Sequence, residues 1–242
     1  METSTSPENV SLNKYGYNAI ARHTFTAIFT CLPLFLAAGT FSWNWAWVYS
    51  AATLIGWLAL SAVLVIENPG LLNDRGKRTK DMLGTKRWDW IILSIYSLLL
   101  FLTPIVAGLD YRNGWSDQSA ASGVVNIIGI LMQLLSFVPL TWAMAVNKSF
   151  QAMVQIKTDG AQPVTATGPY RLVRHPGYMG VILQFIALPL ALTTWAAGIP
   201  ALLGIVLFII RTKLEDDALR SELPGYVEFA ERTRYRLLPG LW

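Results

Sequence analysis

The sequence predicts an all-α integral membrane protein with six transmembrane helices, the last two forming a short hairpin, and a cytosolic C-terminal helical segment. Three observations lead to this fold class. Of the 242 residues, 53% are hydrophobic and 14% are charged, whereas soluble proteins contain roughly 25% charged residues. Uncharged runs long enough to cross a bilayer recur along the chain. The charged residues fall in short segments between those runs.

The first two spans are predicted at residues 24–41 and 43–66, after a polar tail at residues 1–22. Both runs are uncharged and long enough to span. The second opens with three tryptophans, which suit the membrane interface. A cleaved signal peptide is the alternative for the first run, because basic residues precede it. The run is long for such a peptide, and a second span follows at once.

The third and fourth spans are predicted at residues 90–109 and 123–146. A basic loop at residues 67–89 precedes the third span. Residues 110–122, between the two spans, hold a single cation, Arg112.

The fifth and sixth spans share residues 177–210, a run of 34 residues without a charge. A straight helix of that length would reach roughly 50 Å at 1.5 Å per residue, and the hydrocarbon core is only about 30 Å thick. We therefore expect the run to fold back, with the break supplied by Pro189, Thr193-Thr194, Gly198 and Pro200. That reversal would return residue 211 to the side where residue 176 began.

The lysines and arginines predict the orientation of these spans. Of the 19 in the chain, all but Arg112 fall on one face in this topology. The positive-inside rule then places both termini in the cytosol. Beyond the last span we expect residues 211–223 to continue as a charged helix and residues 226–232 to form another. The tail from Arg234 alternates basic and apolar residues and should lie in the headgroup layer.

Several classes of function are disfavoured by composition. The net charge of +4 comes from cations that flank apolar runs, so no nucleic-acid partner is expected. Cys31 is the sole cysteine, and His23 and His175 lie far apart in the sequence, so no metal site is expected either. A transporter or channel predicts ionisable residues in mid-span, and the predicted spans contain none.

Two polar segments border the last uncharged run. Residues 168–178 read Gly-Pro-Tyr-Arg-Leu-Val-Arg-His-Pro-Gly-Tyr, and residues 211–217 read Arg-Thr-Lys-Leu-Glu-Asp-Asp. Taken singly, these groups are typical of a solvated helix end, a structural histidine and an interfacial tyrosine. Polar groups gathered at the mouth of a membrane segment are costly and usually functional. We therefore predict that both segments close on one ligand in a cytosolic pocket, a role that a pure membrane anchor or scaffold would not explain.

The combination of Gly-Pro-Tyr-x-x-x-Arg-His-Pro-x-Tyr with Arg-x-x-x-Glu-Asp, a Pro-Gly-Tyr and the ending Arg-Tyr-Arg-Leu-Leu-Pro-Gly resembles the isoprenylcysteine carboxyl methyltransferase family. That family belongs to a wider group with the phospholipid N-methyltransferases. The close match covers about residues 148–242, and upstream the likeness is one of membrane topology alone. The resemblance implies S-adenosylmethionine-dependent methyl transfer at the cytosolic face.

Site residues follow from the resemblance, position by position. It implies that Arg211 faces the methyl acceptor, with Arg174 as a second catalytic candidate. The implied cofactor-binding residues are Gln155, Gln162, Pro163, Val164, Thr165, Tyr170, His175, Pro176, Gly177, Tyr178 and Glu215. Two positions depart from the family pattern. Gln162 stands where members often have histidine, and Asp216 replaces the second glutamate of the usual acidic pair.

The residue types suit this chemistry independently of the resemblance. Glu215 can balance the sulfonium and ammonium groups of S-adenosylmethionine, and charges interact more strongly near lipid than in water. Arg211 and Glu215 are four residues apart and share a helical face. A carboxylate acceptor is already ionised at neutral pH and needs no general base, whereas an amine acceptor would need one, such as His175 or Asp216.

We therefore predict a membrane methyltransferase that esterifies a lipid-tailed carboxylate, with residues 1–146 forming the tail and first four helices and residues 147–242 the S-adenosylmethionine-binding region. The expected partners are the lipid bilayer and a lipophilic or small-molecule acceptor. Methylation of a phospholipid, or of a small amine or thiol, is the main alternative. A membrane reductase of sterol type would need a nicotinamide site, and the sequence has no signal for one.

Overall fold

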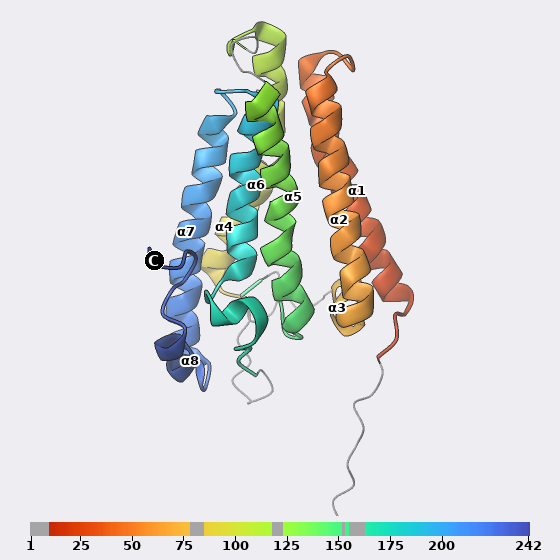
Figure 1. The fold of residues 1–242 in the computed structure, drawn as a ribbon. Helices are drawn as coiled ribbons and strands as arrows, with labels where there is room; N and C mark the ends of the chain where they lie inside the picture. The colour runs from red at the N-terminus through yellow and green to blue at the C-terminus, as the bar shows by residue number, and fades with distance from the viewer. Residues whose placement is uncertain (1–9, 78–84, 118–122, 152, 155–162) are drawn as a thin grey trace, which may run out of the picture.

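The computed structural model describes residues 10–77, 85–117, 123–151, 153–154 and 163–242. Within these residues the chain is all-helical, with eight α-helices and one short 3-10 helix and no strand, which confirms the predicted all-α class. The elements are α1 (Lys14–Ala38), α2 (Asn44–Glu67), α3 (Pro69–Gly76), α4 (Arg87–Asn113), α5 (Gly123–Val146), η1 (Gly168–Arg171), α6 (Pro176–Leu192), α7 (Gly198–Glu222) and α8 (Tyr226–Arg232). The long helices form one bundle, with α3, η1 and α8 at the same end (Figure 1).

Among the described residues, four helices, α1, α2, α4 and α5, are long and apolar enough to cross a membrane. Helices α4 and α5 contain the runs predicted at 90–109 and 123–146, whereas the run 24–41 extends three residues beyond α1 and the run 43–66 begins one residue before α2. Helix α1 starts earlier than expected, within the segment predicted as a polar tail, because the Asn13 side chain accepts a hydrogen bond from the Tyr15 N–H and caps the helix at Lys14. Residues 1–9 of that tail lie outside the described residues.

The last uncharged run is broken at residues 193–197, between α6 and α7, which pack against each other. Thr193 ends α6 in the left-handed region, with a φ of 53°. Asn126 of α5 supports this turn, since its Nδ2 donates to Ala191 O and to Thr193 Oγ1, both at 2.8 Å. Helix α6 has only 17 residues and α7 ends in charged residues, so the count of six spans and the membrane hairpin remain predictions.

Helices α5 and α6 approach each other most closely at glycine. A Cβ atom added to Gly129 would overlap the backbone of Ala191, and one added to Gly180 would overlap the carbonyl oxygen of Ser136. Small residues let membrane helices come into backbone contact. This contact holds α6 against α5. Because α6 begins at Pro176, the contact also fixes the end of the 168–178 segment.

We expect Gly129→Ala to lower the free energy of unfolding by about 1–3 kcal/mol, because backbone atoms cannot move aside as a flexible side chain can. The measurement is thermal unfolding of the purified protein in detergent. Gly198→Ala is the matched control, since a Cβ there meets no described atom within 4 Å. Equal melting temperatures for the two variants would contradict this account of the α5–α6 contact.

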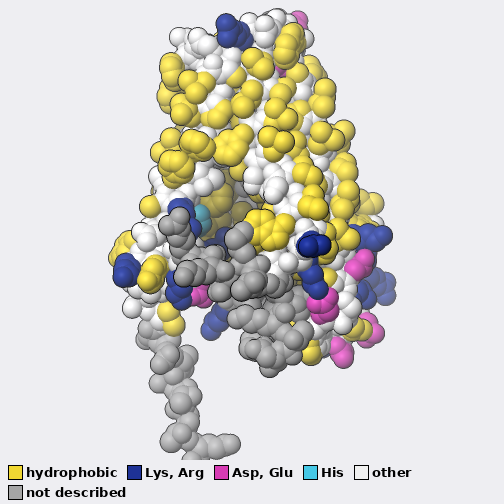
Figure 2. Space-filling view, turned by 180° about the vertical axis from the view of Figure 1, so that it is seen from behind, with side chains coloured by type: hydrophobic (Ala, Val, Ile, Leu, Met, Phe, Trp, Pro, Cys, Tyr) yellow, Lys and Arg dark blue, Asp and Glu magenta, His cyan; other side chains and the backbone are white. Residues whose placement is uncertain are grey.

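The surface separates into an apolar flank and charged ends. Figure 2 shows hydrophobic side chains over most of the long face, with most acidic and basic side chains gathered at one end. Large apolar side chains of the long helices are well exposed, among them Phe25, Ile55 and Leu135, at 61%, 58% and 61%. Soluble monomers rarely expose apolar area on this scale, and a bilayer would cover it. The fold is that of an integral membrane protein.

Candidate active site

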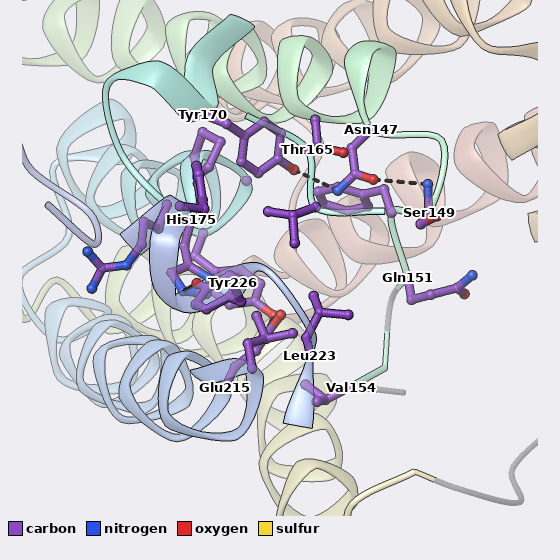
Figure 3. A pocket seen from close by; sticks show the side chains of 18 of the residues that line it. Asn147, Ser149, Gln151, Val154, Thr165, Tyr170, His175, Glu215, Leu223 and Tyr226 are labelled. Atoms are coloured by element: carbon purple, nitrogen blue, oxygen red, sulfur yellow. Dashed lines mark hydrogen bonds between the residues drawn. The ribbon is translucent and has the colours of Figure 1, made fainter. Parts of the chain in front are cut away.

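A pocket lies at the charged end of the bundle, where η1, the start of α6, the end of α7 and α8 meet. Ten of the predicted site residues line it: Pro163, Val164, Thr165, Tyr170, Arg174, His175, Pro176, Gly177, Tyr178 and Glu215. Gln155 and Gln162 lie outside the described residues. Figure 3 shows Tyr170 and Asn147 on one side of the pocket, with Glu215 and Tyr226 on the other. The two polar segments singled out in the sequence therefore share one cavity.

The backbone of the 168–178 segment is fixed by the C-terminal tail. The N–H groups of Arg174 and His175 donate to the carbonyl oxygens of Tyr235 and Arg236, both at 2.9 Å. Pro176 then occupies the first turn of α6, where its missing N–H costs no hydrogen bond. The tail was expected to lie in the headgroup layer, and nothing in its sequence indicated this pairing. The C-terminal tail therefore fixes the backbone of two residues that line the pocket.

Asp216 joins the segments around the pocket. Its carboxylate is fully buried and accepts hydrogen bonds from Arg174 Nε at 2.6 Å, Arg236 Nε at 2.9 Å and the Tyr226 hydroxyl at 2.9 Å. Burial alone would raise the pKa of Asp216, but the hydrogen bonds and charges of His175 and Arg174 outweigh it and hold that pKa well below its usual range. Asp216 is therefore an anchor that is ionised at neutral pH, while its neighbour Asp217 is exposed.

Arg174 was predicted as a catalytic candidate, and its contacts are mainly structural. Besides the two bonds to Asp216, its Nη1 donates to the carbonyl oxygens of Thr233 and Arg234 at 2.7 and 2.8 Å. Its side chain is only 2% exposed. These contacts favour a positioning role, in which Arg174 fastens the tail to α7 at the edge of the pocket.

Arg211, the residue predicted to face the acceptor, is not among the residues that line the pocket. Its Nε donates to Asp89 Oδ1 at 2.8 Å, and both side chains are buried. Its guanidinium carbon lies 4.9 Å from the centre of the Tyr178 ring, which does line the pocket. Asp89 also accepts the Val154 N–H at 2.7 Å. Arg211 is thus one side chain removed from the cavity, behind Tyr178.

Glu215 reaches the pocket from α7 and is held by Tyr178, whose hydroxyl donates to Glu215 Oε2. The rings of His175 and Tyr178 are stacked, 5.6 Å apart and 10° from parallel. On the other side, Asn147 Nδ2 donates to the Tyr170 hydroxyl at 3.1 Å, and burial raises the pKa of Tyr170, which keeps that phenol neutral. One carboxylate and several aromatic faces therefore border the same cavity.

Sequence reasoning missed several residues of the site. Asn147, Phe150 and Phe229 line the pocket, and no motif singled them out. Tyr226 also lines it and bonds Asp216. Tyr226 belongs to the Pro-Gly-Tyr of the family pattern, and this motif could have indicated it as a site residue. Asp89 had no signal, because in the sequence it is one acid in a basic loop and its partner Arg211 is 122 positions away.

The chemistry of the lining suits a ligand that carries both positive charge and a flat ring. Glu215 supplies a negative charge, Tyr170, Tyr226 and Phe229 supply aromatic surface, and Leu219 adds an apolar side chain. S-adenosylmethionine has a sulfonium, an ammonium and an adenine, so these residues fit it. Among the described residues, no group of three or more His, Cys, Asp or Glu side chains could hold a metal ion.

Fold and site together define an integral membrane protein with a ligand pocket at its charged end. Residues 127–221 match the model of the Isoprenylcysteine carboxyl methyltransferase (ICMT) family, which confirms the resemblance predicted from the motifs. The match spans all of α6 and nearly all of α7, and it supports a membrane methyltransferase. It ends before Tyr226 and the tail. No curated protein matches the chain.

Proposed function

We propose that this protein is an integral membrane methyltransferase that uses S-adenosylmethionine to esterify the carboxylate of a lipophilic acceptor. One observation supports it above the others: Glu215 and the 170–178 segment line one pocket, within the part of the chain that matches the family. Helices α6 and α7 would complete six spans, with both termini and the pocket in the cytosol. Residues 1–146 would then serve as the membrane scaffold and residues 147–242 as the cofactor-binding region, joined by the ion pair between Asp89 and Arg211.

In the cofactor site, Glu215 would face the positive groups, while Tyr170 and Tyr226 would border the adenine. His175, Pro176 and Gly177 would shape the floor at the start of α6, with Pro163, Val164 and Thr165 along the rim. When bound, S-adenosylmethionine supplies an electrophilic methyl group: the carbon–sulfur bond breaks as the acceptor oxygen–carbon bond forms, and the electron pair leaves with the neutral thioether. Gln155 and Gln162 remain predicted contacts.

The protein's own residues need to move no proton in this reaction. A carboxylate acceptor is already ionised at neutral pH, so alignment of the two reactants and exclusion of water are the main requirements. An amine acceptor would need a base, and Asp216 is already bound by three arginines and a tyrosine. These contacts speak against Asp216 as that base and leave His175, which lines the pocket, as the candidate for the amine alternative. We propose that Arg211 provides the positive charge that attracts the acceptor carboxylate to the Tyr178 side of the pocket.

The test is a labelled-methyl transfer assay against a prenylcysteine analogue, host lipids and small thiols, together with calorimetric binding of S-adenosylmethionine in detergent. The proposal fails if folded protein neither binds the cofactor nor labels any of these acceptors.

Removing the charge of Arg211 should lower turnover while leaving the affinity for S-adenosylmethionine nearly unchanged. Because Arg211→Ala alone would leave Asp89 buried and unpaired, we favour the double variant Arg211→Met with Asp89→Asn. It removes both charges, and the amide oxygen can still accept the Val154 N–H. We expect cofactor affinity within about two-fold of wild type and turnover reduced at least about ten-fold, or 1.4 kcal/mol. Lys86→Met with Glu222→Gln is the control, because it also removes an ion pair but neither residue lines the pocket. Turnover equal to that control would contradict the role of Arg211.

A further inference from the structure

A second cavity, of about 230 Å³, lies inside the bundle between α1, α2, α4, α5 and α6. It is separate from the pocket described above, and the two share no lining residue. It follows the same face of α6, since Tyr178 borders the first pocket, and Val181, Gln184 and Leu188 border the second. At 1.5 Å per residue, Gln184 lies about 9 Å further along α6 than Tyr178.

Two polar atoms of this cavity have no hydrogen-bond partner among the described residues. They are Oε1 of Gln133 and Nε2 of Gln184, and both side chains line the cavity. Gln133 is only 2% exposed. Burying an unpaired polar group costs about 1–3 kcal/mol, and hydrocarbon offers no substitute partner. A pair of such atoms facing one cavity indicates a ligand that satisfies them.

The orientation of the Gln133 amide follows from its neighbour. The Thr53 hydroxyl donates to Tyr49 O at 2.9 Å, so its oxygen must act as the acceptor toward Gln133. The Gln133 Nε2 lies 3.1 Å from that oxygen and donates to it. This arrangement turns Oε1, an acceptor, away from Thr53. The buried atoms of this cavity that lack a partner are therefore one acceptor, from Gln133, and one donor, from Gln184.

Most of the rest of the lining is apolar or bonded within its own helix, and the polar groups of Thr26, Trp57 and Tyr96 also border the cavity. Leu100, Phe185 and Leu188 contribute hydrocarbon, and the hydroxyls of Thr30 and Thr103 donate to carbonyl oxygens of their own helices at 2.7 Å. A ligand that fits must be mostly hydrocarbon with one group that both donates and accepts. A hydroxyl does both. A purely hydrocarbon tail, such as a prenyl chain, would leave both amide atoms unpaired.

We propose that this cavity holds the hydrocarbon body of the methyl acceptor and that Gln133 and Gln184 recognise a hydroxyl group on it. The preferred acceptor is then a hydroxylated, lipid-like carboxylic acid, with its carboxylate at the Tyr178 end and its hydroxyl about two helical turns deeper. The identity of the ligand as the acceptor rests on the proposed function. The recognition of a hydroxyl rests on the two amide atoms alone.

The test compares two fatty acids, oleate and ricinoleate, which differ by one mid-chain hydroxyl. Their affinities are measured on full-length protein in detergent, for wild type and for Gln133→Leu with Gln184→Leu. The ratio of the two affinities is compared between proteins, so differences in micelle partitioning cancel. We expect wild type to favour ricinoleate and the double variant to reduce that ratio about ten-fold, as two hydrogen bonds of about 0.7 kcal/mol each would give.

Thr103→Val is the control, because its hydroxyl borders the cavity but is already bound to Leu99 O, and it should keep the wild-type ratio. The single variant Gln184→Leu should shift the ratio in the same direction, which keeps the test decisive if the double variant does not fold. A wild-type ratio no higher than that of the glutamine variants would overturn the inference. Cofactor binding by the same proteins decides the proposed function separately, since the fatty-acid ratio does not depend on methyl transfer.

Discussion

Glu215→Gln is expected to weaken S-adenosylmethionine binding at least about ten-fold, equivalent to 1.4 kcal/mol. Glu215 is an acidic residue that lines the pocket, at the end of α7. Charge-assisted contacts are roughly twice as strong as neutral ones, and the surrounding aromatic and apolar side chains lower the local dielectric. The substitution keeps an oxygen that can accept the Tyr178 hydroxyl. The loss would therefore report the missing charge and not a rearranged pocket.

Glu222→Gln is the matched control on the same helix. Glu222 pairs with Lys86 at 2.6 Å and does not line the pocket, so cofactor affinity should stay at the wild-type value. Calorimetry in detergent measures both variants. If Glu215→Gln bound the cofactor as tightly as Glu222→Gln, the assignment of Glu215 would be wrong.

Asp216→Asn should destabilise the protein by about 3–5 kcal/mol, because it leaves buried arginine charge without its partner. Asp216 is fully buried and holds Arg174, Arg236 and Tyr226 at once. Losing its charge should release the C-terminal tail from α7 and open the pocket. Chemical unfolding in detergent gives the stability change, and limited proteolysis should show earlier cleavage in the tail.

Asp217→Asn is the control for this prediction, since Asp217 is the next residue and is exposed. It should change stability by less than about 0.5 kcal/mol. An equal effect of the two substitutions would contradict the role of Asp216 as the anchor.

The pKa shift of Asp216 also determines how its contribution to the free energy of unfolding depends on pH. The folded pKa is depressed, so the stabilisation is fully present above the ordinary value of about 3.9 and is lost only as pH falls through the lower folded value. The stability difference between wild type and Asp216→Asn should therefore not shrink as pH falls from about 8 to 5. A difference that shrank toward pH 5 would show that Asp216 titrates in this range.

The membrane class and the approximate helix positions could be predicted from sequence because they depend on local properties. The four uncharged runs largely coincide with α1, α2, α4 and α5, since a run of apolar residues needs only its own composition to favour a bilayer. The break in the run 177–210 was also expected between Pro189 and Pro200, and it falls at 193–197. Its support by Asn126 was not foreseeable, because that contact crosses 67 positions.

In the candidate site, too, some features could be predicted from the sequence and others could not. Motif recognition placed ten residues that prove to share a pocket, because the residues of a motif keep their types and spacing wherever the chain folds. Their partners were decided by the tertiary structure. Asp89 reaches Arg211 across 122 positions, and the tail reaches Arg174 across about 60. The arginines that looked catalytic in sequence are paired with acids that only folding brings near.

The sequence by itself determined that this protein lies in a membrane, that its charges gather at one end, and that it carries the motifs of a methyltransferase family. Only the tertiary structure decided which side chains face the pocket, which are locked in ion pairs, and where Gln133 and Gln184 meet a second cavity. The reason is physical: apolarity and charge act residue by residue, whereas a buried polar atom is satisfied or left unpaired according to neighbours that are remote in the chain.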